Sequence, residues 1–131
     1  MTPEQLVASM PYAQALGMGV TAAGPEEVVG HLDWAAELCT TGGLLHGGAL
    51  MTLADSLDAI CAFLNLPPGA GTSTIESKTN MFRGVRAGRV TATSTPLHVG
   101  RTTIVVQTDL RTADGKRVAM VTQTQAVLAG S

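Results

Sequence analysis

One acidic residue, Asp55, stands in the middle of a long apolar stretch, GGALMTLADSLDAICAFLN, at residues 47–65. Burial of a carboxylate costs free energy unless the group is paired or put to use, so this placement suggests chemistry. A carboxylate held in a partly apolar site suits a general base or a nucleophile. At helical spacing the neighbouring side chains form a narrow stripe: Thr52, Asp55, Ser56, Asp58 and Ala59. The stripe is equally typical of a solvated or hydrogen-bonded helix edge, and spacing alone leaves both interpretations open.

The residues His46, Gly47 and Gly48 begin the same stretch. Glycine lets a ligand approach the backbone closely, and the free N–H groups of a helix N-terminus attract negative charge. Such a terminus can polarise a carbonyl oxygen or stabilise a tetrahedral oxyanion. The alternative is a flexible junction between loop and helix, in which His46 is a structural hydrogen-bonding group.

The separation of these two features restricts how they can cooperate. Gly47 and Asp55 are eight positions apart in the chain, which is about 12 Å along a helix at roughly 1.5 Å per residue. The two groups therefore cannot act on one carbonyl within one chain. If both are catalytic, they come from two subunits that face each other across a two-fold axis, and a dimer contains two equivalent sites.

The rest of the chain predicts the elements that position these residues. Leucine and isoleucine recur at helical spacing across residues 47–65, and Asn65 with the turn Pro67-Pro68-Gly69 ends this helix. Because most of its circumference is apolar, the helix must be covered on most sides. We also expect a short helix at residues 3–9, two short strands between 16 and 34, a loop at 38–48, and strands at 72–82, 88–99, 102–111 and 117–128. The pattern is typical of an α+β fold with an antiparallel sheet wrapped on one helix.

Composition narrows the class of protein. The length predicts a single domain over residues 1–131. Only 14% of the residues are charged, against roughly 25% in a typical soluble domain, so part of the surface is expected to face another subunit. The net charge of -2 argues against nucleic-acid binding, and two cysteines without metal-type spacing predict neither a disulfide framework nor a metal site. The absence of a membrane-length apolar run and of a signal-peptide pattern predicts a cytoplasmic protein that does not enter a membrane.

Two segments resemble a known family. The motif LLHGGALMTLADSL at residues 44–57 and the stretch FRGVRAGRVTATSTPLHVGRTTIVVQTDLRTADGKRVAMVTQTQAVL at 82–128 are similar to hotdog-fold acyl-CoA thioesterases of the phenylacetyl-CoA and 4-hydroxybenzoyl-CoA type. The similarity covers roughly residues 25–128 and is close to the 1,4-dihydroxy-2-naphthoyl-CoA thioesterase branch. It implies a hotdog fold, in which a five- to six-stranded antiparallel sheet wraps a long central helix. It also implies hydrolysis of an acyl-CoA, and of an aryl-CoA in particular.

The resemblance assigns roles to individual residues. Asp55 matches the catalytic carboxylate, which acts as a general base on water or as a nucleophile on the thioester carbon. Gly47 matches the glycine whose N–H polarises the thioester carbonyl from the opposite subunit, and His46 matches the motif histidine that shapes the site. Thr40 stands where relatives carry Asn or Gln to orient the water or the carbonyl. Thr74 falls at a strand position where some relatives place a hydroxyl beside the nucleophilic water.

The coenzyme A part of such a substrate requires groups that bind phosphate. Arg83, Arg86 and Arg89 cluster around two glycines, and arginine recognises phosphate through paired hydrogen bonds. His98 and Arg101 form a further candidate at a hairpin. Three solvated arginines in a loop are an equally good interpretation of the cluster. The remaining substrate-binding candidates lie on the predicted helix: Gly48, Ser56 and Ala59.

The family forms dimers and dimers of dimers, so the resemblance implies a homodimer or a homotetramer. It implies no cofactor and no metal, because coenzyme A is part of the substrate. Two other functions remain open. One is a non-catalytic acyl-CoA-binding module on the same fold. The presence of an acid, Asp55, at the spacing found in the catalytic family argues against this alternative. The other is a hotdog hydratase or dehydratase, whose aspartate-to-histidine spacing this chain lacks, and no G-x-S-x-G or HExxH motif supports another class of hydrolase.

Overall fold

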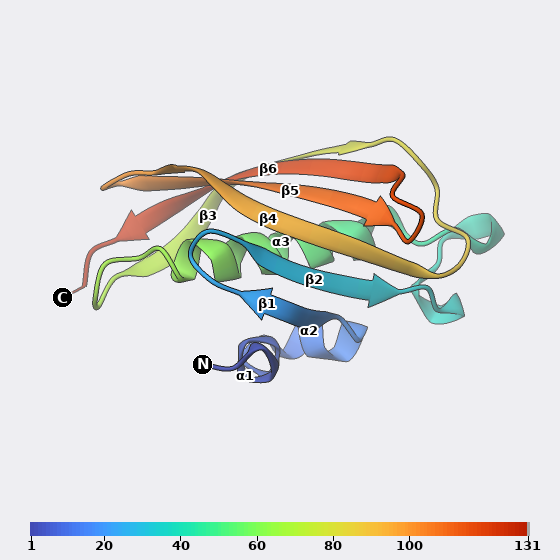
Figure 1. The fold of residues 1–131 in the computed structure, drawn as a ribbon, viewed down its shortest axis with the longest axis horizontal. Coiled ribbons are helices and arrows are strands. Elements are labelled where there is room, and N and C mark those ends of the chain that lie inside the picture. The colour runs from blue at the N-terminus through green and yellow to red at the C-terminus, as the bar shows by residue number, and fades with distance from the viewer. Residues whose placement is uncertain (131) are drawn as a thin grey trace.

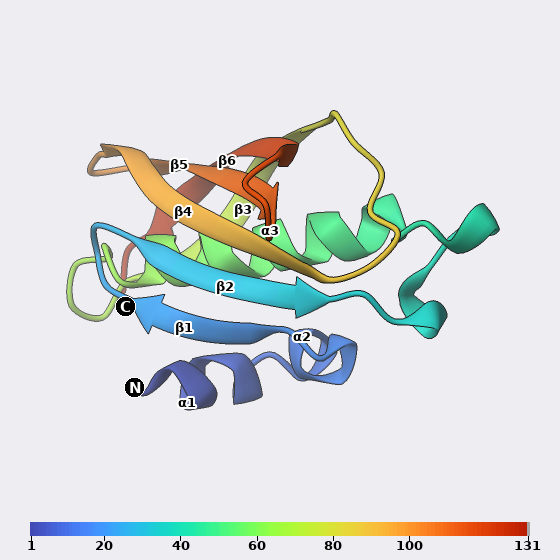
Figure 2. The same ribbon diagram turned by 45° about the vertical axis from the view of Figure 1, so that its right-hand side comes forward.

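One antiparallel sheet and one long helix form the centre of the computed structural model, which describes residues 1–130. The sheet has the strand order β1-β2-β4-β5-β6-β3, and α3 lies along one of its faces (Figure 1, Figure 2). The helices are α1 (Pro3–Ala8), α2 (Pro11–Leu16) and α3 (Gly47–Phe63), and the strands are β1 (Gly19–Ala23), β2 (Val28–Asp33), β3 (Gly71–Met81), β4 (Arg89–Val99), β5 (Thr103–Thr112) and β6 (Arg117–Leu128). This arrangement confirms the predicted α+β class, with a sheet wrapped on a single long helix.

Helix α3 begins at the glycine pair because His46 caps it. The Nδ1 atom of His46 accepts a hydrogen bond from the Gly48 N–H at 2.8 Å, which satisfies one of the donors left free at a helix start. At the other end, the Asn65 side chain donates hydrogen bonds of 2.8 Å to the carbonyls of Cys61 and Pro25. These contacts tie the helix end to the turn between β1 and β2, close to the predicted stop.

The core lies between α3 and the sheet face that the helix covers. Several helix positions have no exposed surface: Leu53, Ala54, Leu57, Cys61 and Ala62. On β5 the fully buried residues alternate with half-buried ones, and the buried set is Ile104, Val106, Thr108 and Leu110. Burial at every second residue means that one face of the sheet contacts the helix and the other faces away from it.

The N-terminal segment forms two short helices, of which the sequence predicts only α1. Thr2 and Gln5 cap α1 reciprocally. Helix α2 starts at Pro11 and is ended by Gly17, which adopts a φ of 85°. Both helices have six residues, too few to establish helical periodicity, and α2 differs from α1 in that no side-chain hydrogen bond caps its start. Helix α1 packs on β1, and α2 packs on α3 (Figure 2).

The sheet edge opposite β1 is uncovered. Strand β3 pairs with β6 alone, and every residue of β3 except Thr72 and Thr79 is exposed. Ile75 and Met81 expose 62% and 44% of their surface. A long edge strand with exposed apolar side chains is a template for pairing with another chain. The exposed edge of β3 is therefore open to pairing with a strand of another chain.

Candidate active site

Asp55 lies on the uncovered face of α3, where its side chain is exposed in the single chain. Its Oδ1 atom accepts a hydrogen bond of 2.8 Å from Nε2 of Gln123, a fully buried residue of β6. The same nitrogen donates to the Thr74 hydroxyl of β3 at 3.4 Å. Helix α3 and two strands thus bring together Asp55, Thr74 and Gln123, of which the sequence singles out the first two.

Two hollows adjoin the Asp55 carboxylate. The first has a volume of about 300 Å³, opens between α3 and β3, and is lined by Met51, Thr52, Asp55, Thr74 and Ser77. The second has a volume of about 280 Å³, lies between α3 and α2, and is lined by residues that include Tyr12, Asp55, Ser56 and Ala59. A carboxylate placed between two hollows can contact a water molecule on one side and a substrate on the other.

The second hollow continues toward the C-terminal end of α3. A third hollow of about 280 Å³ shares Met10 and Ala59 with it. Apart from Ser9, the other side chains of this third hollow are apolar: Met1, Leu6, Ile60 and Phe63. The two hollows adjoin at Met10 and Ala59 and together are here named the α3 slot, which borders α3 from Asp55 to Phe63, about 12 Å of helix.

The start of α3 borders a further hollow of about 530 Å³, whose lining includes His46 and Gly48. Since the Gly48 N–H is bonded to His46, it is not available to a ligand. No hydrogen bond among residues 1–130 engages the N–H of Gly47, which leaves that group free to donate. Gly47 and Asp55 remain about 12 Å apart along the helix, so a single chain does not place them on one carbonyl.

The loop before α3 holds Thr40 apart from Asp55. Thr40 precedes the short turn Thr41–Gly43, its side chain is exposed, and its N–H donates to the Leu44 carbonyl at 2.8 Å. Within residues 1–130 no hydrogen bond joins Thr40 to Asp55, and neither hollow beside the carboxylate includes it. Within one chain, Thr40 therefore lies outside the surroundings of the Asp55 carboxylate.

The three arginines after β3 have different partners. Arg89 forms a bidentate ion pair with Asp33, with N···O distances of 2.6 and 3.0 Å, and this hydrogen bonding lowers the pKa of Asp33. Arg86 donates to the Gly42 carbonyl at 3.0 Å, and both Arg83 and Arg86 are exposed. Arg83 and Arg86 therefore keep donors for a phosphate, whereas the guanidinium of Arg89 is already occupied.

His98 lies near the other end of β4, and Arg101 follows that strand. Arg89 and His98 are nine positions apart, which is about 30 Å along an extended strand. His98 packs over Gly100, where an added Cβ would lie 2.5 Å from the His98 Nε2 atom. The two groups of candidate phosphate ligands thus occupy opposite ends of the sheet and cannot bind the same phosphate.

The acid that the fold buries is Asp58, and the expectation that Asp55 is buried within the apolar helix is wrong for the single chain. Asp58 has no exposed surface, and it accepts hydrogen bonds from Thr108 and, at 3.4 Å, from Ser94. Burial raises the pKa of Asp58 to about 8 against the opposing effect of the Thr108 hydrogen bond, and the nearby Asp55 charge raises it further. Asp58 is therefore a neutral acid at pH 7.

The sequence analysis did not predict the polar cluster of Asp58, Ser94 and Thr108, although part of the pattern that indicates it is present in the sequence. Asp58 follows Ala54 by four positions and precedes Cys61 by three, so it shares the buried helix face. Ser94 and Thr108 are register partners on β4 and β5 and occupy inward positions of both strands. Polar residues at inward positions of two strands, opposite an acid on the buried helix face, mark such a cluster.

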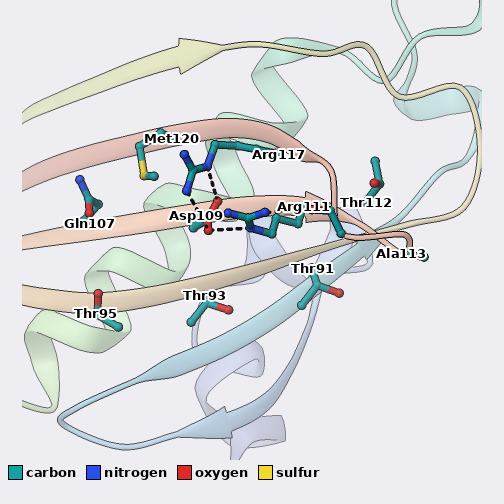
Figure 3. Close-up of a pocket in the computed structure, with 11 residues that line it drawn as sticks. Thr91, Thr93, Thr95, Gln107, Asp109, Arg111, Thr112, Ala113, Arg117 and Met120 are labelled. Atoms are coloured by element: carbon teal, nitrogen blue, oxygen red, sulfur yellow. Dashed lines mark hydrogen bonds and ion pairs between the residues drawn. The ribbon is translucent and has the colours of Figure 1, made fainter.

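A larger hollow lies on the sheet face away from α3. It has a volume of about 610 Å³ and is lined mainly by polar side chains of β4, β5 and β6 (Figure 3). Within it, Asp109 accepts hydrogen bonds from Arg111 at 2.8 Å and from Arg117 at 3.0 Å. Because Asp109 follows the buried Thr108 on β5, the two side chains face opposite sides of the sheet. The sheet therefore separates this hollow from Asp55.

No group of three or more His, Cys, Asp or Glu side chains within residues 1–130 is placed to hold a metal ion. No helix in the same range is long and apolar enough to cross a lipid bilayer.

The chain belongs to the thioesterase superfamily, whose family model matches residues 42–119. A mutant structure of thioesterase PA1618 from Pseudomonas aeruginosa has a TM-score of 0.91 and 34% identity, and the match covers 98% of this chain and 94% of that chain. Thioesterase HI1161 from Haemophilus influenzae gives a TM-score of 0.91 at 29% identity, over 98% of this chain and 91% of that chain. These likenesses confirm the predicted hotdog fold.

Two other relatives bear out the resemblance stated from the sequence. The 1,4-dihydroxy-2-naphthoyl-CoA hydrolase of Escherichia coli is 33% identical over 86 residues, which is 66% of this chain and 63% of that protein. A mutant structure of the phenylacetic acid degradation protein PaaI from Thermus thermophilus has a TM-score of 0.81 and 30% identity, over 88% of this chain and 97% of that chain. In sequence, the chain spans 54–60% of the length of the first curated relatives that it matches.

Replacement of Asp58 by Asn should change how stability depends on pH. The unfolded chain releases the Asp58 proton near pH 3.8, whereas the folded chain keeps it up to about pH 8. Wild-type stability therefore falls as the pH rises through this window and levels off above it. Asp58→Asn has no proton to release, so its free energy of unfolding relative to wild type should rise with pH, by at most about 1.4 kcal/mol per pH unit.

Urea unfolding of both proteins at pH 5, pH 7 and pH 9 measures this difference. The control is Asp114→Asn, which changes an exposed carboxylate whose pKa is lowered by its hydrogen bond with Thr112. The control should differ from wild type by the same amount at all three pH values, because they lie above the pKa of Asp114 in both the folded and the unfolded chain. A constant difference between Asp58→Asn and wild type at all three would contradict a buried neutral acid.

Proposed function

We propose that the protein hydrolyses the thioester bond of an aryl-CoA, and that each site combines Asp55 of one subunit with the Gly47 N–H of another. The observation that carries the proposal is the placement of Asp55, an exposed carboxylate held by Gln123 and bordered by two hollows. Membership of the thioesterase superfamily supports the class of reaction. A thioester is reactive enough for one positioned carboxylate, one water molecule and one backbone donor to serve.

In this reaction Asp55 serves as the general base. With its Oδ1 atom engaged by Gln123, Oδ2 accepts a proton from a water molecule in the hollow beside Thr74 and Ser77. The water oxygen attacks the thioester carbon, and the partner subunit's Gly47 stabilises the resulting oxyanion through its N–H at the helix start. Collapse of the tetrahedral intermediate breaks the C–S bond, and the leaving thiolate takes the proton from Asp55.

A homodimer supplies the second half of the site. β3 is exposed along a sheet edge beside the uncovered face of α3, and apolar side chains are exposed there: Met51, Ile75, Met81 and Phe82. Pairing of β3 with β3 of a second copy buries these side chains and continues the sheet across a two-fold axis. Each Asp55 then meets the helix start of the other chain, while a dimer of dimers remains an expectation of the family.

The α3 slot favours an aryl acyl group. It adjoins Asp55, its far part is lined by Met10, Ile60 and Phe63, and the small side chain of Ala59 leaves it open. Apolar contacts along both faces suit an aromatic ring better than a charged or strongly hydrated group. Two relatives are named for the naphthoyl and phenylacetyl classes, which supports the same acyl chemistry here.

Arg83 and Arg86 are the proposed contacts for the coenzyme A phosphates. The Leu45 N–H donates to the Val85 carbonyl at 2.8 Å, so the arginine loop lies beside the residues that lead into α3. The exposed guanidinium groups of Arg83 and Arg86 suit phosphate recognition. Phosphate bound there leaves the remainder of coenzyme A directed along the surface near the start of α3.

Asp55→Asn should abolish turnover in a protein that still folds. Loss of the general base should lower kcat by at least about 100-fold, and an amide fits the same exposed position on α3. Thiol release measures this loss with benzoyl-, hydroxybenzoyl-, phenylacetyl-, dihydroxynaphthoyl-, short-chain and long-chain acyl-CoA. The control is Glu26→Gln, an exposed carboxylate of the β1–β2 turn.

Near-native turnover by folded Asp55→Asn would rule out its role as the base. Silence of the wild type across the panel, with acyl-CoA still bound, would support the non-catalytic binding module in place of the enzyme. Hydration of an enoyl-CoA by the wild type would support the hydratase.

Two inactive variants should restore activity when their subunits are mixed. Gly47→Pro removes the free N–H, and proline suits this first helical position because His46 has the extended ψ of 134° that precedes proline. Asp55→Ala removes the base. Random exchange of subunits should restore about one quarter of the wild-type site activity, since half of the dimers are mixed and each has one complete site. Absence of recovery, with mixed dimers demonstrated by native mass spectrometry, would contradict a shared site.

Ala59→Leu should lower activity toward an aryl-CoA more than activity toward a short-chain acyl-CoA. The larger side chain fills the point at which the two hollows of the α3 slot meet, so kcat/KM for aryl-CoA should fall about 10- to 100-fold. Turnover of a short-chain acyl-CoA, which does not reach Ala59, is the internal control and should change little. An equal loss for both substrates would place the acyl group elsewhere.

A further inference from the structure

We propose that Gln123 is the positioning residue for the Asp55 carboxylate, an inference that rests on the proposed function. Gln123 is fully buried on β6, and its Nε2 atom donates to Asp55 Oδ1 at 2.8 Å. Asp55 is otherwise an exposed side chain with several accessible rotamers. The buried amide selects one of them and fixes which oxygen faces the water.

The amide nitrogen of Gln123 uses both of its hydrogens at the site. One is directed to Asp55 Oδ1 at 2.8 Å and the other to the Thr74 hydroxyl at 3.4 Å. The reversed amide would turn its carbonyl oxygen toward the carboxylate, and two acceptors would then face each other. The contact with Asp55 therefore determines the orientation of Gln123 as well as that of the carboxylate.

Burial of the Gln123 amide lowers the stability of the fold, and the contact with Asp55 accounts for the presence of an amide at this position. The Oε1 atom of Gln123 is buried and has no hydrogen-bond partner among residues 1–130. An unpaired buried carbonyl is destabilising, and an apolar side chain at this inward position of β6 would avoid that cost. Within the part of the chain that the structure describes, the hydrogen bonds of the Gln123 side chain go only to Asp55 and Thr74.

The backbone of β6 is suited to hold the side-chain amide of Gln123 in a fixed position. β6 is an internal strand, and Gln123 is paired with Ser77 of β3 on one side and with Val106 of β5 on the other. A side chain on a strand hydrogen-bonded along both edges moves less than one on a loop. The rigid sheet thereby sets the position of a carboxylate on the exposed side of the helix.

The chain contains a matched control at Gln125. Gln125 follows on the same strand and faces the same side of the sheet, it exposes 1% of its surface, and its Oε1 is also buried without a partner. No hydrogen bond within residues 1–130 joins Gln125 to Asp55. Substitution of Gln125 by Met therefore reproduces the loss of a buried amide without touching the carboxylate.

The test compares Gln123→Met with Gln125→Met in the intact protein. Gln123→Met keeps the length of the side chain and removes the donor, so kcat for an aryl-CoA should fall about 10- to 100-fold through misplacement of the base, with KM within about twofold. Gln125→Met should keep both the wild-type kcat and the wild-type KM.

A fall in kcat at an unchanged KM, seen in Gln123→Met and absent in Gln125→Met, therefore reports the lost contact with Asp55. Equal losses of kcat in the two variants, or an unchanged kcat in Gln123→Met, would overturn the inference.

A measurement without substrate separates this inference from the proposed function. The side-chain amide resonances of Gln123, assigned by their loss in Gln123→Met, should shift between wild type and Asp55→Asn, whereas those of Gln125 should keep their positions. If the Gln123 shift is observed while the wild type hydrolyses no acyl-CoA, the proposed function is overturned and the contact stands without a catalytic role. If the wild type is active and the Gln123 shift is absent, the positioning role is overturned and the proposed function stands.

Discussion

The burial of α3 is the constraint on which the rest of the structure depends. The helix is apolar around most of its circumference, so the sheet covers one side of it and α2 packs on another. What remains is one stripe along the helix, where Met51, Asp55 and Phe63 are exposed. Asp55 reaches this stripe because its neighbours Leu53, Ala54 and Leu57 are held without exposed surface in the core. The packing of apolar residues thus sets the position of the acid.

Two carboxylates one helical turn apart have opposite environments. Asp58 faces Thr108 and Ser94 in the core, and burial raises its pKa to about 8. Asp55 faces the hollows and accepts a hydrogen bond from a buried amide. Because its raised pKa keeps Asp58 neutral at pH 7, Asp58 adds no negative charge beside Asp55. A second charge three residues away would also oppose the development of the oxyanion, so the neutral state of Asp58 favours the proposed chemistry.

Much of this architecture could be predicted because its signals are local. The glycine pair, the spacing of leucines and Asn65 define α3, and segments rich in Thr and Val within residues 72–128 indicate the long strands. The contacts of Asp58 and Gln123 were not predicted because they join distant segments. Asp55 and Gln123 are 68 positions apart, and no spacing rule connects a helix to the fourth strand after it. Helix α2 was not predicted because it is too short to show a period and no side-chain hydrogen bond caps its start.

The exposed edge of the sheet and the incomplete site have one common physical solution. β3 leaves its backbone edge and the side chain of Ile75 exposed, and the adjoining face of α3 carries Asp55, the proposed base, about 12 Å along the helix from Gly47. In the proposed dimer, a two-fold axis beside β3 would cover the edge and place a second helix start near each Asp55. Apolar burial along β3 would then stabilise an assembly in which Gln123, held in the sheet interior, fixes the proposed base on one side of the substrate. The free N–H of Gly47 would approach from the other side, so the interface that stabilises the proposed dimer would also complete the proposed active site.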